Sequence, residues 1–194
     1  MSQSIQVLLV EDDDDFAFLT GQLLREQSGL ELIGRAASRR EGVELSYALR
    51  PQLVLMDLTL SPGRMDGIDA AREIRLNTEA KVVFLSVYED PKVVLDACRR
   101  SFASSYLFKS QFGLIPDTLR VVAQGHSPQE YMILALILGQ LSSAEQSIFY
   151  RMLGREVSLS SSPKTIANQQ SAVLRKLGLR NKEELLHVFA AYQL

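Results

Sequence analysis

The sequence predicts an α/β protein, with a doubly wound parallel sheet in its first two thirds and a small all-α domain after it. Two observations carry this prediction. Over the first 125 residues, short apolar runs alternate five times with longer amphipathic stretches. After residue 140 only helical patterns follow. Regular alternation of strand and helix is typical of a parallel sheet that is covered by helices on both faces.

The five apolar runs are the expected strands, and each is followed by a helical pattern. The strands are expected over residues 5–10, 30–36, 53–56, 81–86 and 105–108. The helices are expected over residues 15–27, 39–49, 67–76, 91–100 and 114–124. Asp90 before Pro91 combines a capping residue with a preset first turn, which marks the start of the fourth helix.

A break at residues 125–128 divides the chain. Ser127 can cap and Pro128 can open a helix that runs to about Leu138. Its centre is apolar on all sides, so we expect it to be buried on more than one side. The predicted domains are therefore residues 1–125, a linker helix within 126–140, and a helical domain over 141–194, with helices at 143–153, 163–177 and 182–192.

Composition limits the class of protein. Apolar residues make up 46% of the 194 residues, enough for real cores. Residues 1–140 hold 14 Lys and Arg against 19 Asp and Glu, whereas residues 141–194 hold 7 against 4, so a nucleic-acid partner at the C-terminal end is allowed but not required. Cys98 is the single cysteine, and no signal-peptide pattern or apolar run long enough for a membrane span occurs. We expect a cytoplasmic protein.

Polar residues stand where the expected strands end. Glu11 and Asp12 follow the first strand, Asp57 follows the third, Ser86 ends the fourth, and Lys109 follows the fifth. If the strand order is 2-1-3-4-5, the first and third strands are neighbours and their carboxylates meet at the point where the order reverses.

Three carboxylates gathered in this way repel one another unless a cation neutralises them. Oxygen ligands without His or Cys favour Mg²⁺, which also accepts phosphate oxygens. Asp57 can then act as a carboxylate nucleophile toward a phosphoryl group and form an acyl phosphate. The metal ion and Lys109 would offset the charge on the transferring group.

The segments Val-Glu-Asp, Leu-Met-Asp, Leu-Ser and Phe-Lys, in this order over residues 5–124, resemble the receiver domains of two-component response regulators. The resemblance implies a flavodoxin-like receiver fold and a histidine kinase as partner. It implies that Asp57 is the phosphoacceptor and that Mg²⁺ is bound by Glu11, Asp12, Asp57 and the backbone carbonyl of Thr59. It also implies that Ser86 and Lys109 contact phosphoryl oxygens and that Tyr106 is the aromatic residue that moves with Ser86.

Two features depart from the family pattern. The loop after Asp57 is about two residues longer than usual, and Ser110 follows Lys109 where many members have proline. The longer loop could alter kinase docking and the lifetime of the phosphate. Neither departure removes a chemical group from the site.

Residues 162–185 read Ser-Pro-Lys-Thr-Ile-Ala-Asn-Gln-Gln-Ser-Ala-Val-Leu-Arg-Lys-Leu-Gly-Leu-Arg-Asn-Lys-Glu-Glu-Leu. This stretch resembles the recognition and final helices of a LuxR-type helix-turn-helix, so the whole chain resembles a NarL/FixJ-type response regulator. Only residues 155–161 separate Gly154 from Ser162, about six fewer than in the family, so we expect the scaffold helix to be missing or reduced to one turn. Lys164, Asn168, Ser171 and Arg175 lie on one face of the expected recognition helix, and the candidate DNA contacts are Lys164, Thr165, Asn168, Ser171, Arg175 and Lys176.

Three function classes are weighed. The first is a transcriptional response regulator that is phosphorylated on Asp57, dimerises and binds duplex DNA. The second is a phosphorylation-controlled interaction or dimerisation module whose shortened helix-turn-helix does not bind DNA. The third, an independent enzyme, has little support, because the chain has two histidines, one cysteine and no second acid-rich pocket. Catalysis is expected only in the limited sense of self-phosphorylation and dephosphorylation.

Overall fold

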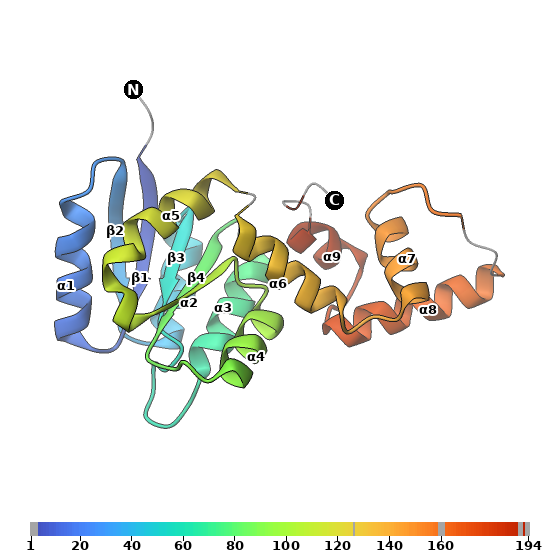
Figure 1. The fold of residues 1–194 in the computed structure, drawn as a ribbon, viewed down its shortest axis with the longest axis horizontal. Helices are drawn as coiled ribbons and strands as arrows, with labels where there is room; N and C mark the ends of the chain where they lie inside the picture. Colours follow the sequence, from blue (N-terminus) through green and yellow to red (C-terminus); the bar gives the residue numbers. More distant parts are fainter. Residues whose placement is uncertain (1–3, 126, 159–161, 190–191, 193–194) are drawn as a thin grey trace. The chain divides into compact units, whose positions relative to one another are not determined.

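The computed structural model describes residues 4–125, 127–158, 162–189 and 192, and its contacts separate two compact units, residues 1–133 and 134–194. The division falls inside the helix that the sequence assigns to the linker. Figure 1 shows the strands and helices of both units. Each unit is described by itself below.

The first unit contains a five-stranded parallel sheet in the order β2-β1-β3-β4-β5, as the sequence predicts. The strands are β1 (Ile5–Val10), β2 (Leu30–Ala36), β3 (Leu53–Met56), β4 (Lys81–Ser86) and β5 (Ser105–Phe108). The helices are α1 (Asp14–Arg25), α2 (Arg39–Leu49), α3 (Asp66–Asn77), α4 (Pro91–Ser101) and α5 (Ile115–Gln124), and a short 3₁₀ helix, η1 (Lys109–Leu114), precedes α5.

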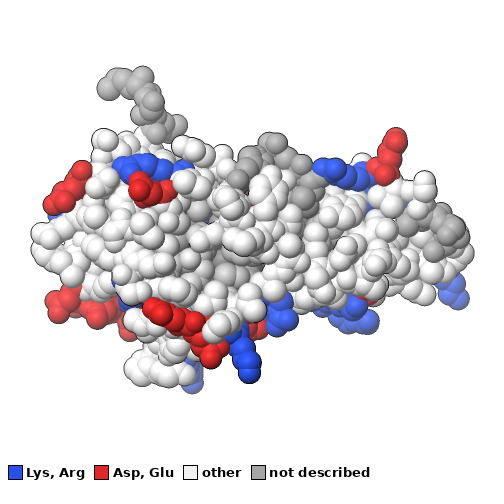
Figure 2. Space-filling view, viewed as in Figure 1, with Lys and Arg blue, Asp and Glu red and all other residues white. Residues whose placement is uncertain are grey.

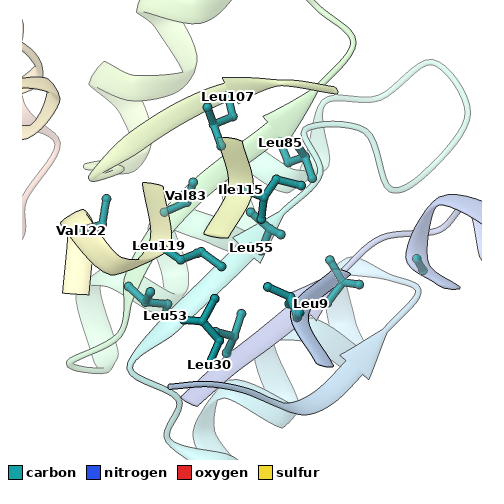
Figure 3. Packing of buried hydrophobic residues seen from close by; sticks show 13 residues of the cluster. Leu9, Leu30, Leu53, Leu55, Val83, Leu85, Leu107, Ile115, Leu119 and Val122 are labelled. Carbon is teal, nitrogen blue, oxygen red and sulfur yellow. The ribbon is translucent and has the colours of Figure 1, made fainter. Parts of the chain in front are cut away.

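The sheet is covered by helices on both faces. One core cluster joins apolar side chains of α1 and α5 to alternate strand residues such as Leu9, Leu55 and Leu85 (Figure 3). The intervening strand residues, such as Val10 and Met56, point to the other face and are also fully buried. Burial on both faces explains why the central strand β3 is continuously apolar.

The helix ends follow the capping signals in the sequence. Asp13 accepts a hydrogen bond from the Phe16 amide at the start of α1, and Asp90 accepts one from the Lys92 amide at the start of α4. Because these caps fix the first turns, the residues just beyond β1 and β4 have defined positions. The carboxyl ends of the strands therefore form a structured edge, where the candidate site lies.

The linker helix α6 (Pro128–Leu138) begins with the predicted cap, because the Glu130 amide donates to the Ser127 hydroxyl over 3.1 Å. Among the described residues no single helix is long and apolar enough to cross a membrane; α6 and α7 (Ser143–Met152) meet that test only as a pair joined through a sharp bend.

The second unit is helical. Besides α7 it contains α8 (Pro163–Leu177) and α9 (Lys182–Phe189). Ile148, Phe149, Val173, Leu185 and Val188 are fully buried. Residues 153–158 and 162 form no helix, and part of the segment where a scaffold helix would stand, residues 159–161, lies outside the described chain. The predicted last helix, 182–192, is described as a helix to Phe189, and residues 190–191 lie outside the described chain.

Candidate functional site

The predicted acidic residues meet at the carboxyl end of the sheet. β1 and β3 are neighbours in register, so Glu11 and Asp12 after β1 lie beside Asp57 after β3. One carboxylate oxygen from each of the three residues lies within 4.8 Å of the others. Glu11 and Asp57 are buried and Asp12 is exposed. Two of the three acids are therefore shielded from solvent, and the third faces it.

Lys109 joins two of these carboxylates. Its Nζ lies 2.7 Å from Asp57 Oδ2 and 2.8 and 2.7 Å from the two oxygens of Glu11, and it donates hydrogen bonds to Asp57 Oδ2 and Glu11 Oε1. The lysine reaches them because it follows β5 directly, at the start of η1. Two carboxylates, those of Glu11 and Asp57, thus lie within hydrogen-bonding distance of one ammonium group.

The charges in this region change one another's pKa values. Burial raises the pKa of Glu11 to about 7, and the negative charge of Asp57 raises it too, while the hydrogen bond from Lys109 opposes the change. Burial lowers the pKa of Lys109, but Asp57 and Glu11 together outweigh burial and leave it raised. Lys109 therefore stays charged at neutral pH.

Backbone groups and an aromatic ring support the site. The Thr59 amide donates to Asp57 Oδ1 over 3.2 Å, which fixes the carboxylate of Asp57. The ring of Phe16 lies under Lys109 Nζ, 4.4 Å from its centroid, and packs edge-on against Phe112. Phe16 was not among the predicted site residues, although it lies four residues after Asp12 on the first turn of α1.

Ser86 and Tyr106 form a second polar group beside the acidic pocket. Ser86 is fully buried at the end of β4, and its Oγ accepts a hydrogen bond from the Tyr88 amide over 3.3 Å. The Tyr106 ring is buried, and its hydroxyl donates to the Tyr88 carbonyl over 2.9 Å. Burial raises the pKa of Tyr106 to about 12, an effect that the nearby Ser86 hydroxyl partly opposes. Tyr106 is therefore a neutral hydrogen-bond donor.

A glycine keeps the start of α3 close to Asp57. A Cβ on Gly67 would lie 2.0 Å from the Asp57 carbonyl oxygen and 2.9 Å from that of Leu58. The Gly67 amide donates to the Leu58 carbonyl over 3.1 Å. The long loop between them is held by Asp66, whose carboxylate accepts from the Leu60 amide and the Ser61 hydroxyl. The sequence analysis missed this steric role of Gly67.

The oxygen ligands fit a divalent cation such as Mg²⁺. Glu11, Asp12 and Asp57 present hard oxygen atoms from two neighbouring loops. The Oε2 atom of Glu11 is buried and accepts no hydrogen bond, and it lies 2.7 Å from Lys109 Nζ, so a cation bound here would share this oxygen with the lysine.

The candidate DNA contacts lie on α8. Lys164, Asn168, Ser171 and Arg175 are exposed at helical spacing along one face, and Thr165 and Lys176 are exposed beside them. Lys176 Nζ lies 2.6 Å from Glu145 of α7, so this lysine connects two helices of its own unit. Basic side chains predominate over the second unit on the face in Figure 2, whereas acidic ones gather over the first.

Comparison with known proteins agrees with this geometry. The family model for the response regulator receiver domain matches residues 7–115. The chain is 32% identical over 139 residues to the transcriptional regulatory protein LiaR of Bacillus subtilis, covering 71% of this chain and 64% of LiaR. It is 28% identical over 151 residues to the response regulator VraR of Staphylococcus aureus, covering 77% of this chain and 70% of VraR.

The fold is also shared with a solved structure along nearly the whole chain. RcsB of Salmonella typhimurium matches with a TM-score of 0.56 at 19% identity, covering 97% of this chain and 99% of the RcsB chain. The receiver family model covers more than half of the chain, so the chain belongs to the response regulator receiver family, and its similarity to LiaR and VraR supports a NarL/FixJ-type response regulator.

Proposed function

We propose that this protein is a two-component response regulator that a partner histidine kinase phosphorylates on Asp57 with Mg²⁺, and that phosphorylation controls DNA binding by the C-terminal unit. The convergence of Glu11, Asp12, Asp57 and Lys109 at one strand edge carries the proposal. Among the described residues, Glu11, Asp12 and Asp57 are the one group of three acids that lie this close together, and Lys109 pairs with two of them.

The chemistry is a phosphoryl transfer. A carboxylate oxygen of Asp57 forms a bond to phosphorus as the bond from phosphorus to the donor's imidazole nitrogen breaks, and the electron pair leaves with the imidazole. Bound Mg²⁺, held by Glu11, Asp12, Asp57 and the Thr59 carbonyl, would neutralise charge on the transferring group. Lys109 then pairs with one phosphoryl oxygen and the Ser86 hydroxyl donates to another.

The direct test of this assignment is Asp57→Asn. The amide removes the nucleophile but keeps the size of the side chain, so uptake of phosphate from acetyl phosphate with Mg²⁺ is expected to be abolished, as measured by intact-protein mass. Asp66→Asn is the matched control, because Asp66 is a nearby acid at the start of α3 whose carboxylate accepts hydrogen bonds from the loop residues Leu60 and Ser61. An Asp57→Asn protein that still takes up phosphate refutes the site assignment.

Metal binding is expected to depend on pH because the pKa of Glu11 is raised to about 7. Protons compete with the metal for this carboxylate, so the affinity for Mg²⁺ should fall by roughly tenfold between pH 8 and pH 6. Without metal, the folded chain holds this proton more tightly than the unfolded chain, so the contribution of Glu11 to stability falls as pH rises from about 4.5 through 7.

Calorimetric titration with Mg²⁺ at pH 8 and pH 6 measures this dependence. Glu11→Gln should bind Mg²⁺ more weakly and with a flatter pH profile, because the titrating ligand is gone. Equal affinity of the wild-type protein at both pH values would contradict the role of Glu11.

DNA binding by the second unit rests on the exposed face of α8. Lys164 and Arg175 can contact phosphates, while Asn168 and Ser171 can contact bases. Two such helices in a phosphorylation-dependent homodimer would reach half-sites about one helical turn apart. The phosphorylated protein should therefore shift duplex DNA, and the shift should weaken steeply as salt increases.

The same experiment tests the alternative function. Arg175→Ala should lower the affinity for DNA. It should also reduce the slope of log affinity against log salt concentration by about the amount expected for one phosphate contact. Arg99→Ala, in α4 of the first unit, is the matched control. Absence of any shift at low salt would favour an interaction or dimerisation module that does not bind DNA, without affecting the assignment of Asp57.

A further inference from the structure

Two side chains in the first turn of α6 accept hydrogen bonds from residues at the starts of β4 and β5. Glu130 Oε1 accepts a hydrogen bond from Lys81 Nζ, at the start of β4, over 2.8 Å. Gln129 Oε1 accepts from the Ser105 hydroxyl and, over 3.2 Å, from the Tyr106 amide, at the start of β5. We call these side chains, Lys81, Ser105, Gln129 and Glu130, the linker clasp; all of them lie in the first unit.

The ion pair of the clasp is largely shielded from solvent, and further hydrogen bonds hold its geometry. The side chains of Lys81 and Glu130 are only 19% and 7% exposed. Lys81 Nζ also donates to the Val122 carbonyl in α5 over 3.0 Å, and Glu130 completes a capping box with Ser127. A buried ion pair gains little net stability but tolerates only a narrow range of arrangements. The clasp therefore fixes the start of α6 on the sheet.

A chain of hydrogen bonds leads from the phosphorylation site to this clasp. The Tyr88 amide donates to Ser86 Oγ, and the Tyr106 hydroxyl donates to the Tyr88 carbonyl. The amide of the same Tyr106 donates to Gln129. Ser86 ends β4, the strand that pairs with β3, after which Asp57 follows. These hydrogen bonds all join described residues of the first unit, and they begin at Ser86, whose strand is the neighbour of the strand that Asp57 follows.

We propose that the linker clasp transmits the phosphorylation state of Asp57 to α6, with Gln129 as the positioning residue that joins Tyr106 to the linker. This inference rests on the proposed function. When the Ser86 hydroxyl turns to a phosphoryl oxygen, the Tyr88 backbone and the Tyr106 side chain that depend on it change position. Because the Tyr106 amide donates a hydrogen bond to Gln129 Oε1, that change reaches the first turn of α6 through hydrogen-bonded residues.

Hydrogen exchange of full-length protein tests the proposal. With Mg²⁺ and beryllium fluoride, a phosphoryl mimic, exchange in a peptide covering α6 should change in the wild-type protein. Gln129→Ala should lose most of this response, and Glu130→Gln, which keeps the shape but removes the charge that faces Lys81, should weaken it. Gln124→Ala, an exposed glutamine at the end of α5, is the matched control and should respond like the wild type.

Coupling must also act in the reverse direction. If α6 responds to the phosphoryl mimic, then Gln129→Ala must change the affinity for beryllium fluoride, by about fivefold or more for a typical coupling. A merely structural role would lower the melting temperature and leave that affinity unchanged. The proposal is overturned if the Gln129→Ala protein shows the same hydrogen-exchange response of α6 and the same affinity for beryllium fluoride as the wild-type protein.

Labelling of the same preparations with acetyl phosphate separates the two claims. A wild-type protein that is labelled on Asp57 but whose α6 does not respond refutes only the role of the clasp. A wild-type protein that is not labelled refutes the proposed function itself.

Discussion

Lys109→Ala should lower the free energy of unfolding of the metal-free protein by about 3–5 kcal/mol at pH 8, because two buried carboxylates lose the ammonium that pairs with them. The distances of 2.7 Å to Asp57 and Glu11 and the 13% exposure of the lysine make this an internal ion cluster rather than a surface pair. Urea denaturation with and without Mg²⁺ measures the effect. Saturating Mg²⁺ should recover much of the loss, because it supplies positive charge to the same oxygens.

The loss in Lys109→Ala should be smaller at pH 6 than at pH 8, because Glu11 takes up a proton as the pH falls through about 7 and removes one of the two charges. Lys92→Ala, an exposed lysine near the start of α4, is the matched control and should change stability by less than about 0.5 kcal/mol. A Lys109→Ala protein as stable as this control would contradict the ion cluster.

Gly67→Ala is expected to disrupt both the fold around Asp57 and its phosphorylation. The added Cβ would lie 2.0 Å from the Asp57 carbonyl oxygen, so backbone rather than a flexible side chain must move. Such overpacking typically costs about 1–3 kcal/mol, and we expect the upper end of that range or more, because the obstacle is main chain. Displacement of Asp57 should also slow its labelling by acetyl phosphate.

Gly113→Ala is the matched control for this substitution, because a Cβ at Gly113 meets nothing within 4 Å. Circular dichroism melts and the rate of acetyl phosphate labelling should place Gly113→Ala beside the wild type and Gly67→Ala far below it. Normal labelling of a folded Gly67→Ala protein would show that the close approach of α3 to Asp57 is not needed.

The sheet could be predicted from the sequence because each strand is a short run rich in apolar residues, and the central strand β3 is buried at every position. The bounds of all five strands agree with the structure, and so do those of α2, α6 and α8. Bounds were less accurate where capping competes with the apolar pattern. The predicted helix at residues 15–27 starts instead at Asp14, because Asp13 caps it, and ends at Arg25.

The acidic pocket could be predicted because it follows from strand order: the ends of β1 and β3 must meet in this sheet. The contacts that depend on the direction of individual side chains could not be predicted from the sequence. Neither the closeness of Phe16 to Lys109 nor that of Gly67 to Asp57 has a distinct local pattern in the sequence. The same holds for Gln129, which reaches β5 across 23 residues of chain.

The second unit shows a different limit. Ser162 and Asn181 cap the starts of α8 and α9: the Thr165 amide donates to Ser162 Oγ and the Glu184 amide to Asn181 Oδ1. The shortened segment between α7 and α8 follows from residue spacing alone. What α8 contacts depends on a partner, which neither periodicity nor capping encodes.

A crystal structure of the protein with Mg²⁺ and beryllium fluoride is the most direct test of the central claim, that acids from two neighbouring strand ends form one metal pocket beside a reactive carboxylate. We predict a beryllofluoride group on Asp57, one cation in contact with Glu11, Asp12 and Asp57, and Lys109 moved from Glu11 to a fluorine of the mimic. An unmodified Asp57 with Lys109 still bound to both carboxylates, at saturating concentrations of both reagents, would contradict it.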